Sequence, residues 1–177
     1  MRTFLTSRGI TRPEGTPQDP PEADTISGIG NRKNTLITQA IATEGVQTFP
    51  ETITYLKAVR AAGLATAVVT ASANGQAVLA AAGLQDLLDG RIDGRIAASE
   101  NLPGKPAPDT FWAGARLLGV EPEHAVVIED AVSGVQAGRA GGFGYVIGVD
   151  RLDQREELLA AGADVVVREL TELMGDR

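Results

Sequence analysis

Three short stretches of the 177-residue sequence carry side chains that can bind a phosphate group or the cation that accompanies it. The first, TASANG at 70–75, directly follows the apolar run 64–69. A hydroxyl group beside the backbone N–H groups of a helix start supplies hydrogen-bond donors to an anion. Ser, Thr and Asn are also common helix caps, so a capping function is the alternative interpretation of this stretch.

The second stretch is GKPAPD at 104–109, in which Lys105 lies in a loop that contains two prolines. Proline restricts the backbone, so this loop is expected to be stiff and extended. A positive charge held in a stiff loop is suited to neutralising a phosphate group. A proline-rich loop without a ligand is the alternative.

The third stretch is the acidic pair Glu129 and Asp130, which follows the apolar run 125–128. Adjacent carboxylates repel each other, and burying them is costly unless a cation compensates. Mg²⁺ is the natural candidate, because it binds through one or two carboxylates while keeping waters and phosphate oxygens as ligands. A solvated acidic turn is the alternative.

The elements that must position these side chains alternate between short apolar runs and helical segments. We expect strands at 64–69, 125–128, 145–149 and 164–167, each followed by a helix. This alternation predicts a doubly wound α/β fold with a buried parallel sheet. Ligands of such sheets bind at the carboxyl ends of the strands, which is where the three stretches are predicted to meet.

The amino-terminal part of the sequence lacks this alternation. A proline-rich loop is expected over residues 11–25, followed by a helix at 32–43 with Asn31 as its cap. Pro50 then opens a second helix, at 51–62, which ends at Gly63. The first thirty residues do not form a complete domain by their pattern.

Composition excludes several classes of function. A formal charge of −7 and an aromatic content of 4% argue against a nucleic-acid partner or an anionic membrane surface. The absence of cysteine excludes disulfides, thiolate metal sites and cysteine nucleophiles. No apolar run is long enough for a membrane helix or a secretory signal, so we expect a cytoplasmic protein.

The three stretches together resemble motifs of the haloacid dehalogenase (HAD) superfamily, in the branch that contains β-phosphoglucomutase. The matching segments are AVVTASAN at 67–74, GKPAPDTF at 104–111 and VVIEDAVSGVQAGRAGGFGYVIGVD at 126–150. The resemblance implies a HAD-like, Rossmann-like parallel sheet with helices on both faces. It also implies two parts, namely a partial helical cap segment at 1–48 and an α/β core at 49–177.

The resemblance also implies roles for individual residues. Thr70 would bind the transferring phosphoryl group and Lys105 would neutralise its charge, which makes them the expected catalytic residues. Glu129 and Asp130 would hold Mg²⁺ as the metal ligands.

The expected substrate contacts are Ser72 and Asn74, which occupy polar contact positions of this branch. The segment GIGNRKN at 28–34 looks like part of the cap of the same branch. Arg32 is therefore expected to be a second phosphate contact, with a solvent-facing arginine at a helix start as the equal alternative.

One motif of the family is missing from this sequence. Members of the family use an Asp-x-Asp after an amino-terminal strand, whose first Asp attacks phosphorus and whose second acts as acid and base. The sequence contains no Asp-x-Asp. We therefore expect an amino-terminally truncated member that lacks the first central strand, binds Mg²⁺ weakly and is inactive alone.

These observations lead to one main hypothesis and two rivals. The main hypothesis is the carboxyl-terminal part of a Mg²⁺-dependent phosphatase or sugar phosphomutase that acts on a phosphorylated small molecule such as a sugar phosphate. The rivals are a non-catalytic phosphosugar-binding or regulatory module and a truncated product without function. The expected protein partner is either a missing amino-terminal segment or a second copy bound through the open sheet.

Overall fold

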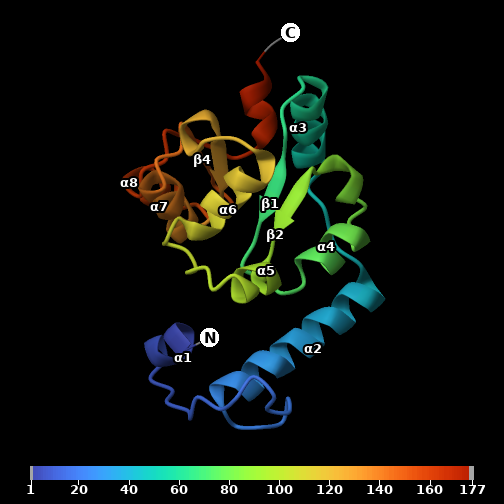
Figure 1. Cartoon of the computed structure of the whole chain (residues 1–177), viewed down its shortest axis with the longest axis vertical. Coiled ribbons are helices and arrows are strands. Elements are labelled where there is room, and N and C mark those ends of the chain that lie inside the picture. Colours follow the sequence, from blue (N-terminus) through green and yellow to red (C-terminus); the bar gives the residue numbers. More distant parts are fainter. Residues whose placement is uncertain (1, 176–177) are drawn as a thin grey trace. The chain divides into compact units, whose positions relative to one another are not determined.

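The computed structural model describes residues 2–175, apart from the side chains of residues 3 and 4. The chain divides into two compact units, Met1–Val46 and Gln47–Arg177, which are described separately below. Figure 1 shows the order of the elements along the chain.

The amino-terminal unit contains two helices, α1 (Arg2–Ser7) and α2 (Ile26–Glu44). Thr25 begins α2, because its side-chain hydroxyl accepts a hydrogen bond from the N–H of Gly28 at 2.9 Å. The predicted start at residue 32 is therefore wrong. Asn31 lies inside α2, where its side-chain amide donates to the carbonyl of Asp19 at 2.8 Å and holds the proline-rich loop instead of capping the helix.

The carboxyl-terminal unit carries the remaining helices. They are α3 (Pro50–Ala61), α4 (Gly75–Ala81), α5 (Gly94–Ser99), α6 (Asp109–Leu118), α7 (Val132–Ala140) and α8 (Arg155–Ala160), with short 3₁₀ helices η1 (Gln85–Leu87), η2 (Pro122–His124) and η3 (Leu170–Met174). The helix predicted at 51–62 is α3, whose bounds differ from the prediction by one residue at each end. Over residues 2–175, no helix combines the length and apolar character needed to cross a membrane.

All strands of this unit pair in parallel, which confirms the predicted α/β class. They are β1 (Ala67–Val69), β2 (Gly90–Ile92), β3 (Val126–Glu129), β4 (Tyr145–Val149) and β5 (Val165–Val167). They form two sheets, with the orders β1-β2 and β3-β4-β5. Within the described part of the chain, β1 pairs with β2 alone and β3 with β4 alone, so each keeps one unpaired edge.

Strand β2 was not predicted from the sequence. It has three residues, Gly-Arg-Ile, which is too short and too polar to produce a recognisable apolar run. Its pairing with β1, in the register Val69 to Ile92, is what stabilises it as a strand. The carboxyl end of β2 therefore lies beside the carboxyl end of β1.

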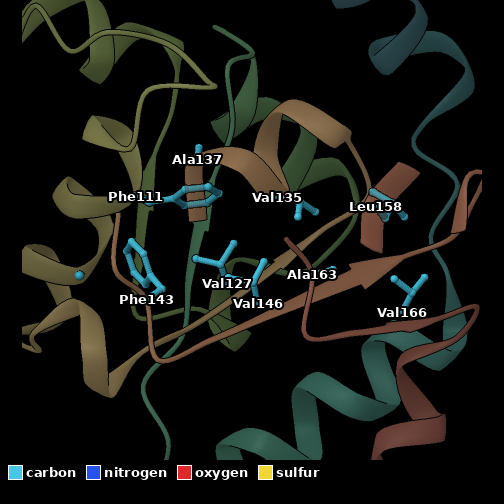
Figure 2. Packing of buried hydrophobic residues seen from close by; sticks show 10 residues of the cluster. Phe111, Val127, Val135, Ala137, Phe143, Val146, Leu158, Ala163 and Val166 are labelled. Carbon is cyan, nitrogen blue, oxygen red and sulfur yellow. The ribbon is translucent and has the colours of Figure 1, made fainter. Parts of the chain in front are cut away.

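The main hydrophobic core packs α6, α7 and α8 against the three-stranded sheet (Figure 2). Phe111 of α6 meets Phe143 edge-on, with ring centroids 5.9 Å apart. Val69 of β1 packs against the same cluster, so both sheets share one core. The buried members are Phe111, Ala115, Val127, Val135, Ala137, Phe143, Val146, Leu158, Ala163 and Val166.

Candidate active site at the carboxyl ends of the strands

The loop between β1 and α4 is folded by its own hydroxyl groups. The backbone N–H of Ser72 donates to Oγ1 of Thr70 at 3.1 Å, and the N–H of Asn74 donates to Oγ of Ser72 at 3.1 Å. Both hydroxyls accept in these bonds, so their own protons are available to donate to an anion. Asn74 occupies the cap position of α4 without a side-chain capping bond, which removes the capping alternative for this residue.

Lys105 lies in the loop before α6 and is mostly buried, with 16% of its side chain exposed. Its ammonium group lies 3.5 Å from the carbonyl oxygen of Val69, the last residue of β1. It also forms an ion pair with the carboxylate of Glu129 and lies 4.4 Å from the ring centroid of Phe111. One positive charge thus joins the carboxyl ends of β1 and β3.

Glu129 is the last residue of β3, and only 10% of its side chain is exposed. One carboxylate oxygen pairs with Lys105, and the other accepts a weak hydrogen bond from the N–H of Ala131 at 3.4 Å. Gly134 of α7 lies directly against this side chain, so that a Cβ atom at position 134 would overlap the carboxylate. The close approach of α7 requires glycine there and holds Glu129 in place.

Asp130 has a different environment from its neighbour. The residue is exposed, and over residues 2–175 its carboxylate makes no ion pair. Its backbone carbonyl accepts from the side-chain amide of Gln154 at 2.7 Å, which fixes the turn after β3.

The two acids of the pair differ in their availability to a cation. Glu129 is already neutralised by Lys105, whereas Asp130 is free to ligate. The described residues contain no group of three or more side chains arranged to hold a metal. One or two carboxylates still fit Mg²⁺, since that ion takes its remaining ligands from water and phosphate oxygens.

The predicted site residues fall into two groups. Thr70, Lys105, Glu129 and Asp130 lie at or beside the carboxyl ends of β1 and β3, with Ser72 and Asn74 in the same loop as Thr70. Arg32 lies in α2 of the amino-terminal unit, is exposed, and makes no ion pair within the described residues.

An ion pair at the end of β2 was not predicted from the sequence. Nε of Arg91 lies 2.8 Å from a carboxylate oxygen of Asp93, whose side chain is 2% exposed. Burial disfavours ionisation of Asp93, but the N–H of Ile96, the charge of Arg91 and the N–H of Arg95 outweigh it and lower its pKa. The Asp-Gly pair at 93–94 is a recognisable helix-start signal that would have located this residue.

The chain was then compared with known proteins. The family model described as haloacid dehalogenase-like hydrolase matches residues 13–142, which include the proposed metal and phosphate residues. A β-phosphoglucomutase of Mycobacterium bovis is 49% identical over 177 residues, which is 98% of this chain and 68% of that protein. A trehalose-phosphate phosphatase of Mycobacterium leprae is 34% identical over 133 residues, covering 71% of this chain and 29% of that protein.

Solved structures give the same result. CbbY from Rhodobacter sphaeroides, in complex with xylulose-(1,5)bisphosphate, superposes with a TM-score of 0.72 at 27% identity. That match covers 88% of this chain and 68% of the CbbY chain, so the present sequence spans about two thirds of that relative. The family match over most of the chain and the 49% identity lead to one conclusion: this chain belongs to the haloacid dehalogenase-like hydrolases.

Proposed function

We propose that this chain supplies the phosphate-binding and cation-binding part of a phosphoryl-transfer site for a phosphorylated sugar. The observation that carries the proposal is the position of Lys105, whose ammonium contacts both the end of β1 and Glu129 at the end of β3. A fixed positive charge between two strand ends is suited to phosphoryl oxygens that gain charge during transfer.

Thr70 and Glu129 act together with Lys105 in this proposal. The hydroxyl of Thr70 donates a hydrogen bond to a phosphoryl oxygen, since it acts only as an acceptor in its bond with the N–H of Ser72. Glu129 holds the Lys105 ammonium at the site and does not itself react with phosphorus. Lys105 then shares its remaining hydrogen-bonding capacity with the phosphoryl group.

Mg²⁺ is the cofactor that we propose for this site. Asp130 would be its principal protein ligand, because this carboxylate is exposed and unpaired within the described residues. When bound, the ion supplies further neutralisation of the phosphoryl oxygens. Two adjacent carboxylates, one of them engaged by lysine, support weak binding in this chain alone.

The proposed substrate contacts are Ser72 and Asn74, which share the loop of Thr70, and Arg32 as a second phosphate contact. The relatives support a phosphorylated sugar, since they include a β-phosphoglucomutase and a trehalose-phosphate phosphatase, and one solved relative holds a sugar bisphosphate. Hydrolysis and transfer between sugar hydroxyls require the same phosphate cradle, and both reaction types occur among these relatives.

Turnover by the 177-residue chain alone is not expected. In the proposed reaction a carboxylate oxygen forms a bond to phosphorus, the bond to the sugar oxygen breaks, and that oxygen takes a proton from a second acid. The Asp-x-Asp that would supply both groups does not occur in the sequence. Loss of a covalent nucleophile commonly lowers turnover by several orders of magnitude.

A non-catalytic phosphosugar-binding module is the second candidate. It is favoured by the combination of an ordered Thr70–Lys105–Glu129 arrangement with the absence of Asp-x-Asp. Such a module would retain the affinity for phosphate while lacking the groups that react.

Binding and turnover measured on the same preparation test both candidates. The purified chain is mixed with Mg²⁺ and a panel of hexose and trehalose phosphates, and bound ligand and released phosphate are recorded. We expect saturable binding without turnover, and weaker binding for Lys105→Met than for the control Lys57→Met, which removes an exposed lysine of α3.

Each other result has a defined meaning. Absence of binding to every sugar phosphate would overturn both candidates. Turnover that persists through repurification would overturn the expectation of inactivity. Turnover that appears only after addition of a segment carrying Asp-x-Asp would favour the transfer site over the binding module.

A further inference from the structure

A cavity of about 370 Å³ lies between α4 and α5, beside the edge strand β2. Its polar wall is formed by Asn74, Gln76, Gln85, Arg91, Asp93 and Arg95, and its remaining wall by small or aliphatic side chains. Lys105 and Glu129 do not line it, whereas Asn74, a proposed substrate contact of the transfer site, does. Its volume lies within the range of small-molecule sites.

Arg91 is anchored in the cavity wall by an ion pair. Its Nε lies 2.8 Å from one oxygen of Asp93, while the other oxygen accepts from the N–H groups of Arg95 and Ile96 at 3.0 and 3.1 Å. Gly75 packs closely on this pair, because a Cβ at that position would lie 2.9 Å from Cβ of Asp93. Both carboxylate oxygens of Asp93 are therefore engaged, one by Arg91 and the other by backbone N–H groups. The ion pair fixes the Nε side of the Arg91 guanidinium group.

Nε of Arg91 pairs with Asp93 by charge, without hydrogen-bond geometry, and no ion pair or hydrogen bond of its two outer nitrogens is seen within the described part of the chain. Arg95 is exposed and has no ion-pair partner among residues 2–175. The side chains of Gln76 and Gln85 likewise have no hydrogen bond there. Four side chains thus present unused polar groups to one cavity.

The charge of the cavity is opposite to that of the chain. Two guanidinium groups face one carboxylate there, whereas the whole sequence carries a net charge of −7. Guanidinium groups bind the oxygens of phosphate and carboxylate through paired N–H donors. The two glutamine amides add donors and acceptors that match hydroxyl groups.

We propose that this cavity binds a small hydroxylated organic anion, with its phosphate or carboxylate head on Arg91 and Arg95 and its hydroxyls on Gln76 and Gln85. The proposal does not depend on phosphoryl transfer at Lys105. Asn74 lines the cavity and also belongs to the loop that follows Thr70, so an anion bound here contacts that loop.

Nuclear magnetic resonance of the ¹⁵N-labelled chain tests the proposal without an activity readout. Inorganic phosphate is titrated in one series and malate in another, and the Nε–Hε signals of Arg91 and Arg95 are followed. We expect saturable shifts of these signals and of the amides at 94–96 in at least one series. The series that saturates identifies the head group.

Two variants locate the bound anion. Arg95→Gln should weaken the affinity at these signals about tenfold, since a charge-assisted hydrogen bond contributes about that factor. The control Arg168→Gln removes the same charge from an exposed arginine paired with Asp153, and it should leave the affinity unchanged. Dispersed spectra of both variants establish that they are folded.

A third variant distinguishes phosphate bound at the candidate transfer site from phosphate bound in the cavity. Lys105→Met should abolish the shifts near Thr70 and preserve those of Arg91 and Arg95. Shifts confined to the Thr70 loop, or equal losses for Arg95→Gln and Arg168→Gln, would overturn the proposal. Failure of both anions to produce saturable shifts would overturn it as well, whatever the outcome at the transfer site.

Discussion

The ammonium group of Lys105 and the carboxylate of Glu129 form an ion pair between residues 24 positions apart in the sequence. The pair bridges two strands that do not pair with each other, because Lys105 also approaches the carbonyl of Val69 at the end of β1. Both side chains are at least 84% buried, so each charge depends on the other. The same ammonium is the group that we propose to meet phosphate.

Separating this pair should cost stability. Lys105→Met leaves Glu129 buried without a counter-charge, and we expect the free energy of unfolding to fall by about 2 kcal/mol. The double variant Lys105→Met/Glu129→Gln should recover part of the loss, because both charges are then gone. Urea unfolding of the two single variants and the double variant measures the coupling. Additive losses would contradict a direct interaction.

Asp93 should make the stability of the chain sensitive to acid. Its folded pKa lies below the ordinary aspartate value of 3.8, so its contribution is complete above pH 3.8 and is lost as the pH falls through the folded pKa. Asp93→Asn should lose about 1–3 kcal/mol near neutral pH, because the buried Arg91 Nε then lacks its charged partner.

The corresponding measurement is urea unfolding between pH 3 and pH 7. The stability difference between the parent chain and Asp93→Asn should shrink as the pH falls below 3.8. Asp153→Asn serves as the control, because the Asp153 side chain is 89% exposed. A difference that does not change with pH would show that Asp93 is not charged in the folded chain.

Magnesium binding should depend on Asp130 and on phosphate. We expect weak binding of Mg²⁺ by the chain alone, since the site offers few protein ligands and Mg²⁺ retains its waters. Inorganic phosphate should strengthen it, and Asp130→Asn should remove most of the heat in a calorimetric titration. Asp153→Asn is again the matched control. Tight binding of Mg²⁺ without phosphate would contradict this prediction.

The unpaired edge of β3 should promote self-association. Val126 and Ile128 on this strand are 55% and 38% exposed, although the intervening Val127 is buried. An apolar strand with a free edge is a template for pairing with another chain. Sedimentation velocity at rising concentration should therefore detect dimers or larger species, and Val126→Lys should reduce them more than Leu152→Lys, whose parent side chain is 78% exposed. A chain that is monomeric at every concentration would refute the prediction.

A peptide segment that adds a strand should stabilise the unpaired edges of β1 and β3. We expect a segment that contains an apolar strand followed by Asp-x-Asp to raise the melting temperature and to produce turnover, because it provides both backbone pairing and a nucleophile. A matching segment with Asn in place of both Asp residues should raise the melting temperature without turnover. If neither segment affects a cooperatively folded chain, the binding-module alternative is favoured.

The sequence alone was sufficient for the elements with strong local patterns. The run Tyr145–Val149 is a strand with the predicted bounds, and the helix predicted at 51–62 is found at Pro50–Ala61. Apolar periodicity decides such elements, because the buried face recurs at the period of the strand or helix. The candidate stretches at 70–75 and 129–130 were likewise visible as residue types that follow predicted strands, and the stretch at 104–109 as a lysine between prolines and glycine.

Local patterns did not reveal β2 or the cavity behind it. Strand β2 has three residues and exists through its pairing with β1, and the cavity requires α4, α5 and β2 to meet. Arg91 and Asp93 are separated by one residue, so alternation along a strand would place them on the same face, but their ion pair becomes apparent only once β2 is known to be a strand.

The tertiary structure also decided what each acid of the pair at 129–130 does. In the sequence Glu129 and Asp130 are equivalent adjacent carboxylates. Folding turns Glu129 inward against Lys105 and Gly134, while Asp130 stays exposed. Successive residues at a strand end point to opposite sides, and only the packing of α7 and of the Lys105 loop determines which side is buried.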